Sequence, residues 1–249
     1  VDLIYGLPKQ TLNSFRNTLE RVIAASPDRL SVFNYAHLPE RFKPQRRIDI
    51  QALPSASEKL DILQMTAELL EKAGYVFIGM DHFAKPGDEL AVAQRDGTLY
   101  RNFQGYSTHA DADLVGLGVS AIGKVGDSYA QNSADLQQYY ERIDAGELAI
   151  TRGILLDRDD VLRRDVITRL ICNFSLDFNA VSQQWQIDFA AYFATELMNL
   201  RQMSEDHLLE IDDQGIQVMA PGRLLIRNIC QVFDAYQKSD GEQRYSRMI

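Results

Sequence analysis

The sequence predicts an α/β fold: a parallel sheet of alternating strands and helices, followed by a mainly helical segment. Three runs rich in Val, Ile, Leu, Phe and Tyr, typical of buried strands, occupy residues 1–7, 29–35 and 75–80. The segments between them repeat apolar residues at the spacing of an amphipathic helix. From residue 135 onward the helical spacing predominates. Parallel sheets bind ligands at the carboxyl ends of their strands, so site residues are expected there.

The two helices between these strands have recognisable ends. The first stops before Pro27, which cannot continue a helix. The second begins at a capping-box signature formed by Ser55 and Glu58, and it ends at Gly74, where a glycine cap is typical. The order strand, helix, strand, helix, strand is that of βαβ units.

The texture changes after the third strand. Residues 114–123 combine apolar residues with glycines, which suits close backbone packing better than a long helix. Beyond a boundary near residue 134, helices are expected at 136–143, 159–172, 189–200 and 224–236. Residues 208–211 and 215–219 flank a turn signal and predict a hairpin between helices, an arrangement like a winged helix.

Composition and charge limit the class of function. The formal charge is -9 and the isoelectric point is about 5.0, which disfavours the electrostatic attraction behind most nucleic-acid binding. No apolar run approaches the roughly 20 residues needed to span a bilayer. Cys172 and Cys230 lie among apolar residues, as buried thiols of a reducing compartment do. We therefore expect a cytoplasmic enzyme that binds neither nucleic acid nor membrane.

Asp2 is a carboxylate in an otherwise apolar strand. Burying an unpaired carboxylate is costly, so we expect Asp2 to have a partner. That partner is either a structural cation or the hydroxyl or ammonium groups of a bound ligand.

Phe103 and Gln104 place an aromatic ring beside an amide that both donates and accepts hydrogen bonds. Such a pair suits an adenine-like group, although ordinary packing beside a surface amide is the simpler alternative. Ile122 lies in an apolar stretch and, from its surroundings alone, is a core residue.

Two histidines and a cationic loop follow the predicted strands. His37 and His82 could form a metal site with Asp81, but no recognised ligand spacing supports it. We favour a role in positioning cofactor or substrate, because imidazole both donates and accepts near neutral pH. The loop carries Arg41, Lys43, Arg46 and Arg47. These cations are either solvated or paired with the carboxylates of an acidic substrate.

Several separated segments point to one family. They are 1–8 (VDLIYGLP), 34–39 (NYAHLP), 79–106, 223–230 (RLLIRNIC) and 245–249 (YSRMI). In this order they resemble the oxygen-independent coproporphyrinogen III oxidases, radical S-adenosylmethionine (SAM) enzymes of haem biosynthesis. The resemblance implies that residues 1–134 are the C-terminal part of a radical-SAM partial (β/α) barrel with a substrate- and SAM-binding extension. It implies a mainly helical, winged-helix-like C-terminal domain in residues 135–249.

The family's reaction is the function that the resemblance implies. It is the oxidative decarboxylation of two propionate side chains of coproporphyrinogen III to vinyl groups, which gives protoporphyrinogen IX. In the family, a [4Fe-4S] cluster reduced by an electron donor cleaves SAM to a 5′-deoxyadenosyl radical, which abstracts hydrogen from a propionate. The cluster is held by a CxxxCxxC motif, which this sequence lacks.

The resemblance also implies that two SAM molecules bind, and it implies which residues contact them. Asp2 and Ala36 match positions that contact the first SAM. Phe103, Gln104 and Ile122 match positions that surround the second. The candidate substrate-binding residues are His82, Arg46 and Arg47, because the arginines could pair with the four propionates of coproporphyrinogen III.

Three hypotheses remain open at this point. The favoured one is that the chain, which opens at Val1 directly in a strand, is the C-terminal part of a larger monomeric oxidase. We expect this part alone to be inactive, because half a parallel barrel leaves an open edge. The second hypothesis is a related haem chaperone that binds haem without decarboxylation. The third is a helical module that only docks a partner through residues 135–249.

Overall fold

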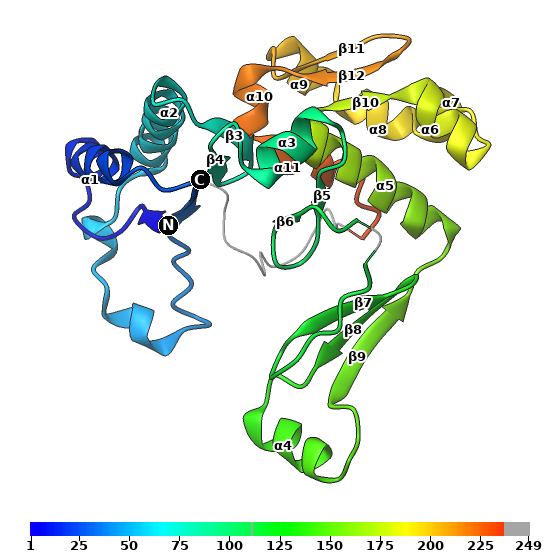
Figure 1. Ribbon diagram of the computed structural model, residues 1–249, viewed down its shortest axis with the longest axis horizontal. Coiled ribbons are helices and arrows are strands. Elements are labelled where there is room, and N and C mark those ends of the chain that lie inside the picture. The colour runs from blue at the N-terminus through cyan, green and yellow to red at the C-terminus, as the bar shows by residue number, and fades with distance from the viewer. Residues whose placement is uncertain (111, 237–249) are drawn as a thin grey trace. The chain divides into compact units, whose positions relative to one another are not determined.

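The computed structural model describes residues 1–110 and 112–236, which form two compact units, 1–97 and 98–236 (Figure 1). None of the helices in these residues combines the length and the apolar character needed to cross a membrane.

The unit of residues 1–97 is built on a four-stranded sheet. Its elements are β1 (Asp2–Tyr5), α1 (Leu12–Ala25), β2 (Arg29–Asn34), two short 3-10 turns (Lys43–Arg47 and Ile50–Ala52), α2 (Ala56–Lys72), β3 (Val76–Gly79), β4 (His82–Ala84) and α3 (Glu89–Arg95). The strand order is β1-β2-β4-β3. β1 and β2 are parallel, and β4 is antiparallel to both β2 and β3, so β3 runs in the same direction as β1 and β2. The predicted parallel strands are confirmed, and β4 is an additional strand between them.

The helix ends follow the predicted signals. Ser55 N donates to Glu58 Oε2 at 2.8 Å, and Glu58 N donates to Ser55 Oγ at 3.3 Å, so the capping box of α2 is present. Gly74 follows this helix with a φ of 86°, a left-handed conformation that glycine adopts without steric cost.

The two faces of the sheet are covered differently. On one face Leu30, Val32 and Phe83 are at most 1% exposed. Helix α1 packs on this face, where the ring centroids of Tyr5 and Phe15 are 6.2 Å apart. On the other face, side chains of β1 and β2 are open to solvent, with Ile4 47% and Phe33 38% exposed. A closed (β/α) barrel turns such a face inward and fills it with side chains.

The unit of residues 98–236 contains three small sheets and a set of helices. Its elements are β5 (Tyr100–Arg101), β6 (Tyr106–Ser107), β7 (Ile122–Val125), β8 (Ser128–Asn132), α4 (Leu136–Asp144), β9 (Ile150–Leu155), α5 (Arg158–Asn173), β10 (Ser175–Asp177), α6 (Phe178–Trp185), α7 (Phe189–Tyr192), α8 (Ala194–Asn199), α9 (Arg201–Glu205), β11 (Leu209–Ile211), β12 (Gly215–Val218), α10 (Ala220–Leu224) and α11 (Ile226–Gln231).

The predicted hairpin of the second half is confirmed as β11 and β12, which β10 extends to a three-stranded sheet of order β10-β12-β11. The helices predicted at 136–143 and 159–172 are α4 and α5. The helix predicted at 189–200 is divided into α7 and α8 at Phe193, and the one predicted at 224–236 is shorter because α11 ends at Gln231.

A three-stranded antiparallel sheet, β7-β8-β9, was not expected from the sequence (Figure 1). The glycine-dotted segment leads into it. A Cβ at Gly123 would come 2.8 Å from the Leu114 carbonyl oxygen, and one at Gly116 would come 2.9 Å from the Ile122 carbonyl carbon. The predicted close backbone packing is therefore confirmed.

Because of this sheet, the boundary between the two compact units lies earlier in the chain than the predicted boundary near residue 134. Because β7 and β8 pair with β9 beyond residue 149, residues 98–134 belong to the second compact unit and the units divide between Gly97 and Thr98. The assignment of 1–134 and 135–249 to functional domains stays a prediction. Residue 111 and residues 237–249, with the segment 245–249, lie outside the described residues.

Candidate functional site

In the first unit, one row of side chains crosses the solvent-exposed face of the sheet. Asp2 of β1 lies opposite Ser31 of β2, and Ser31 lies opposite His82 of β4. Paired residues on adjacent strands project to the same face. The structure therefore brings Asp2 and His82, two predicted site residues, to one face and one row.

Asp2 itself corrects an expectation. Its side chain is exposed, and no hydrogen bond or ion pair joins it to another described residue. The expected structural cation is thus absent from the part of the chain that the structure describes. The reason is that Asp2 shares the uncovered face with Ile4 and Phe33, where a carboxylate stays hydrated.

The carboxyl ends of β1 and β2 form the rim of this unit, as predicted. Ala36 lies two residues beyond β2, and Gln45 Nε2 donates to its carbonyl oxygen at 3.0 Å. Since Ser31 pairs with Asp2, Ala36 is five residues further along, at most roughly 17 Å for an extended strand. Only an elongated ligand could touch both Asp2 and Ala36.

Gly6 closes the rim at the end of β1. Its φ is 84°, and a Cβ there would come 3.1 Å from both Asn34 Oδ1 and Lys59 Cε. Burial lowers the pKa of the Lys59 ammonium, and burial with the nearby charge of Asp81 raises the pKa of Tyr5 to about 12. The rim is therefore a tightly packed place where a side chain at position 6 is not accommodated.

The histidines and arginines of this unit have local partners. His82 Nδ1 is 3.9 Å from Asp81 Oδ1, and the rings of His82 and Phe33 meet edge-on at 6.2 Å. His37 Nδ1 lies 3.4 Å from the Tyr35 hydroxyl. Arg46 Nε donates to the Pro39 carbonyl oxygen at 2.9 Å, which holds its own loop.

Arg47 is exposed on the same 3-10 turn as Arg46. The structure therefore gives Arg46 a structural contact, and the role of both arginines in substrate binding stays a prediction. Among residues 1–110 and 112–236, no three His, Cys, Asp or Glu side chains gather as a metal site.

In the second unit, Phe103 and Gln104 form the tip of the β5–β6 hairpin. Asn102 Oδ1 accepts hydrogen bonds from Gln104 N at 2.9 Å and from Gly105 N at 3.2 Å. This turn holds the Phe103 ring 51% exposed and leaves Gln104 exposed as well. Both side chains are thus presented outward on a short, hydrogen-bonded turn, the geometry needed for contact with a ligand.

Ile122 lies close to this hairpin through β8. Phe103 packs edge-on against Tyr129 with ring centroids 4.9 Å apart. Tyr129 pairs with Lys124, and Ile122 is two residues before Lys124 on the same face of β7. The structure therefore brings Phe103 and Ile122 to one side of the β7–β8 pair.

A cavity of about 580 Å³ lies beside this hairpin. Its walls are aromatic, aliphatic and charged, and are formed by Tyr100, Arg101, Asn102, Phe103, Lys124, Tyr129, Leu156, Asp160, Arg163, Arg164, Ile167, Thr168, Ile171, Asp234, Ala235 and Tyr236. Phe103 is the only predicted site residue among them, and the cations were not predicted. The signal that could have found Lys124 and Tyr129 is the Gly126–Asp127 turn dipeptide between two short runs, which marks a hairpin.

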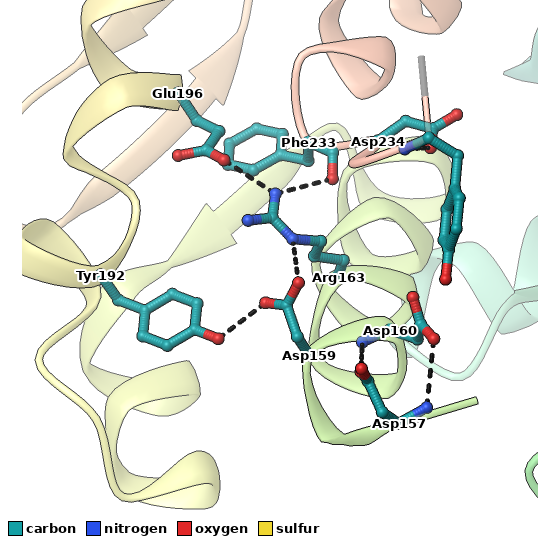
Figure 2. Close-up of polar contacts among 9 residues, drawn as sticks. Asp157, Asp159, Asp160, Arg163, Tyr192, Glu196, Phe233 and Asp234 are labelled. Carbon is teal, nitrogen blue, oxygen red and sulfur yellow. Dashed lines mark hydrogen bonds and ion pairs between the residues drawn. The ribbon is translucent and has the colours of Figure 1, made fainter. Parts of the chain in front are cut away.

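One wall of the cavity contains an ion network around Arg163 (Figure 2). Arg163 donates to Asp159 Oδ2 and to Glu196 Oε1, both at 2.7 Å, and the Tyr192 hydroxyl donates to Asp159 Oδ1 at 2.7 Å. Burial raises the pKa of Asp159, but Tyr192 and Arg163 outweigh it, and the net pKa lies below its ordinary value. The same hydrogen bond raises the pKa of Tyr192. Asp157 and Asp160 form the capping box of α5, and Asp159 pairs with Arg163.

The cysteines are buried, as predicted. Burial raises the pKa of Cys172 to about 12 and raises that of Cys230 further. Iron–sulfur clusters bind thiolates, usually four of them. Two protonated, buried thiols do not fit such a cluster, so these residues are packing residues.

Comparison with known proteins agrees with this geometry. Residues 156–225 match the family model described as the HemN C-terminal domain. The oxygen-independent coproporphyrinogen III oxidase of Salmonella typhimurium is 60% identical over 250 residues, which cover 100% of this chain and 55% of that protein. The oxidase of Thermostichus vulcanus is 47% identical over 250 residues, and these cover 77% of its length.

A solved structure gives the same result. The protein described as "Coproporphyrinogen III oxidase (HemN) from Escherichia coli is a Radical SAM enzyme" superposes with a TM-score of 0.91 at 60% identity, over 95% of this chain and 54% of that one. The chain therefore spans about half the length of several of its relatives and shares the fold of the corresponding part of a radical SAM enzyme. It belongs to the family of oxygen-independent coproporphyrinogen III oxidases.

Proposed function

We propose that this chain is part of an enzyme that decarboxylates two propionates of coproporphyrinogen III to vinyl groups, giving protoporphyrinogen IX without oxygen. The observation that carries the proposal is the identity of 47% to 60% with such oxidases over the whole chain. The enzyme is proposed to be a cytoplasmic monomer that receives electrons from a separate donor. Residues 1–134 are proposed as its barrel portion and residues 135–249 as its C-terminal domain.

The contribution of the first unit is cofactor binding. We assign Asp2 and Ala36 to one SAM molecule, because an exposed carboxylate can accept hydrogen bonds from the ligand's hydroxyl or ammonium groups. His82, in the same row as Asp2, is positioned to orient what lies on that face. SAM and a reduced [4Fe-4S] cluster, when bound, supply the oxidising chemistry.

The contribution of the second unit is a stacking surface. Phe103 presents a ring that is 51% exposed, and Gln104 presents an amide beside it. An adenine ring can stack on the phenylalanine while the amide accepts and donates hydrogen bonds to its edge. Ile122, on the face of β7 that Lys124 shares, adds an apolar contact. We assign these three residues to a second SAM molecule.

This chain has no residues suited to bind the cluster, since both cysteines are buried and protonated. The cluster would therefore be held by other parts of the enzyme. We propose that residues 1–249 alone do not cleave SAM, and measurable cleavage by this isolated polypeptide would contradict that proposal.

The test is an anaerobic assay of the full-length protein with coproporphyrinogen III, SAM and a chemical reductant. We expect carbon dioxide release and, after oxidation in air, the fluorescence spectrum of protoporphyrin. Haem binding with no decarboxylation would instead support the chaperone hypothesis and contradict the proposed reaction.

The cofactor assignment is tested separately by Asp2→Asn, which should weaken SAM binding about tenfold because a charge-assisted hydrogen bond is lost. The exposed Asp61 of α2 makes no hydrogen bond or ion pair with the described residues, so Asp61→Asn serves as the control.

A further inference from the structure

The cavity beside the β5–β6 hairpin is bounded by cations that lack a full set of anionic partners. Lys124 Nζ lies 5.4 Å from the centroid of the Tyr100 ring and pairs with no carboxylate of the described residues. The Arg101 guanidinium lies 5.6 Å from the centroid of the Tyr106 ring, and its buried Nε has no acceptor. Arg164 donates to Asp127 at 3.0 Å through Nη2, but its buried Nη1 has no acceptor.

The two acids in the same walls each accept a backbone hydrogen bond. Asp160 Oδ2 accepts from the Asp157 backbone N at 3.1 Å, and Asp234 Oδ1 accepts from the Tyr236 backbone N at 2.9 Å. The remaining cation, Arg163, is paired with both Asp159 and Glu196. The lining thus has four cations, Arg101, Lys124, Arg163 and Arg164, against two carboxylates, and Lys124 has no carboxylate partner among the described residues.

Cys230 and Cys172 both interact electrostatically with Arg101, and neither supplies an anion, because burial raises the pKa of Cys230 and does the same for Cys172. Burial raises the pKa of the Cys172 thiol to about 12, although Arg101 acts in the opposite direction. Both thiols are therefore neutral at physiological pH, and neither is a counter-ion for Arg101.

Lys124 has no carboxylate partner among the described residues, and Arg164 is paired only with Asp127, which is 64% exposed, so this wall of the cavity favours an anionic ligand. The rings of Tyr100 and Tyr129 in the remaining walls suit a flat apolar body. Together they describe a carboxylate attached to an aromatic or macrocyclic framework. Guanidinium groups match a carboxylate with two parallel hydrogen bonds, and an ammonium adds a point charge.

We propose that this cavity binds a propionate of the tetrapyrrole substrate, with Lys124 and Arg164 as its counter-charges and the tyrosine rings beside the macrocycle. The inference rests on the proposed function for the identity of the substrate. The amino-acid end of SAM also carries a carboxylate, but it carries an ammonium group as well. Because four cations line the cavity against two carboxylates, a ligand that brings only negative charge is favoured over one that also brings an ammonium group.

The experiment uses the full-length protein and coproporphyrin III, the fluorescent oxidised form of the substrate, as the binding probe. Lys124→Met should weaken coproporphyrin binding about tenfold, because a charge-assisted hydrogen bond is lost. Lys124→Arg should restore most of the affinity. The tetramethyl ester of the probe, which carries no charge, should bind wild type and Lys124→Met equally.

The matched control is Lys72→Met, which removes the same charge from the exposed end of α2, where the lysine lies 3.9 Å from Glu68. It should leave coproporphyrin affinity unchanged. In the activity assay, Lys124→Met should raise KM while kcat changes little. If Lys124→Met has a lower melting temperature than wild type, the test uses the wild-type protein instead. Its affinity for coproporphyrin should fall as the salt concentration rises, whereas its affinity for the tetramethyl ester should not change.

Unchanged coproporphyrin affinity in a folded Lys124→Met protein would overturn the inference. A loss of SAM affinity in Lys124→Met, with coproporphyrin affinity unchanged, would also overturn the inference and would assign the cations to the cofactor. If the wild-type protein binds coproporphyrin through Lys124 but releases no carbon dioxide, the proposed reaction fails and the propionate site stands. The two failures are therefore distinguishable.

Discussion

Arg163 and Arg164 are consecutive residues of α5 with opposite surroundings. Arg163 is 17% exposed and is held between Asp159 and Glu196 (Figure 2). Arg164 is 22% exposed, but its one carboxylate partner, Asp127, is 64% exposed, and one of its nitrogens has no acceptor. Arg163 is therefore held by two carboxylates at partly buried positions, and Arg164 by one carboxylate that is largely exposed. This difference in pairing is why we propose a structural role for Arg163 and a ligand-binding role for Arg164.

The largest expected effect comes from the removal of Arg163. Arg163→Met in the full-length protein should lower the free energy of unfolding by about 2–3 kcal/mol, because it leaves the carboxylates of Asp159 and Glu196 unpaired at partly buried positions. Urea unfolding followed by circular dichroism measures it. Arg95→Met, which removes an exposed arginine 3.9 Å from Asp96, is the control and should cost less than about 0.5 kcal/mol. Equal losses in the two variants would contradict the structural role of Arg163.

The next effect concerns Arg164, whose removal should affect ligand affinity more than stability. Arg164→Met should change the free energy of unfolding by less than about 1 kcal/mol, because its ion pair with Asp127 is largely exposed. The same variant should lose coproporphyrin affinity, whereas a folded Arg163→Met protein should retain it. Fluorescence titration of both variants makes the comparison. The contrast breaks if the two arginines affect stability and affinity alike.

A smaller effect concerns acid stability. The pKa of Asp159 is lowered in the folded state, so its contribution is present above its unfolded pKa of about 3.9 and is lost as pH falls through the folded value. Asp159→Asn should therefore make the urea midpoint less dependent on pH in the acid range. Asp61→Asn should keep the wild-type dependence. A pH profile of Asp159→Asn identical to that of wild type would show that the carboxylate contributes nothing through its charge.

The smallest expected effect is that the two cysteines do not react with an alkylating reagent in the native protein. Because the pKa of Cys172 is about 12 and that of Cys230 is raised as well, iodoacetamide at pH 8 should not label the native protein within the time that labels both thiols in urea. Mass spectrometry counts the labels. Rapid labelling of Cys172 in the native state would mean that a thiolate is present and that Arg101 has an anionic partner after all.

Much of the first unit could be predicted because its signals are local. The strands β1, β2 and β3, the capping box at Ser55 and Glu58, and the glycine after α2 all follow from neighbouring residues. β4 could not be predicted, because three residues between two turns carry no periodicity. In the second unit β9 is exposed along its whole length, so the alternation that marks a half-buried strand is missing.

The candidate site was less predictable than the fold. Asp2 stood out as a charge in an apolar strand, but its solvent-exposed position and its row with His82 depend on strand pairing. Ala36 and Ile122 have no chemistry of their own, and only the family resemblance selects them. Lys124 and Arg164 look like ordinary surface cations in the sequence, because their place in the cavity wall depends on contacts between residues far apart in the chain.

The register of β1 against β2 has a consequence for how this chain can vary. Side chains alternate between faces, so the insertion of a single residue in the middle of β2 would exchange the positions of Val32 and Phe33. The buried valine would be turned to water, and Ser31 would leave the row it shares with Asp2. Length changes among natural variants should therefore be found in the connection between β2 and α2, residues 35–55, and not within the strands.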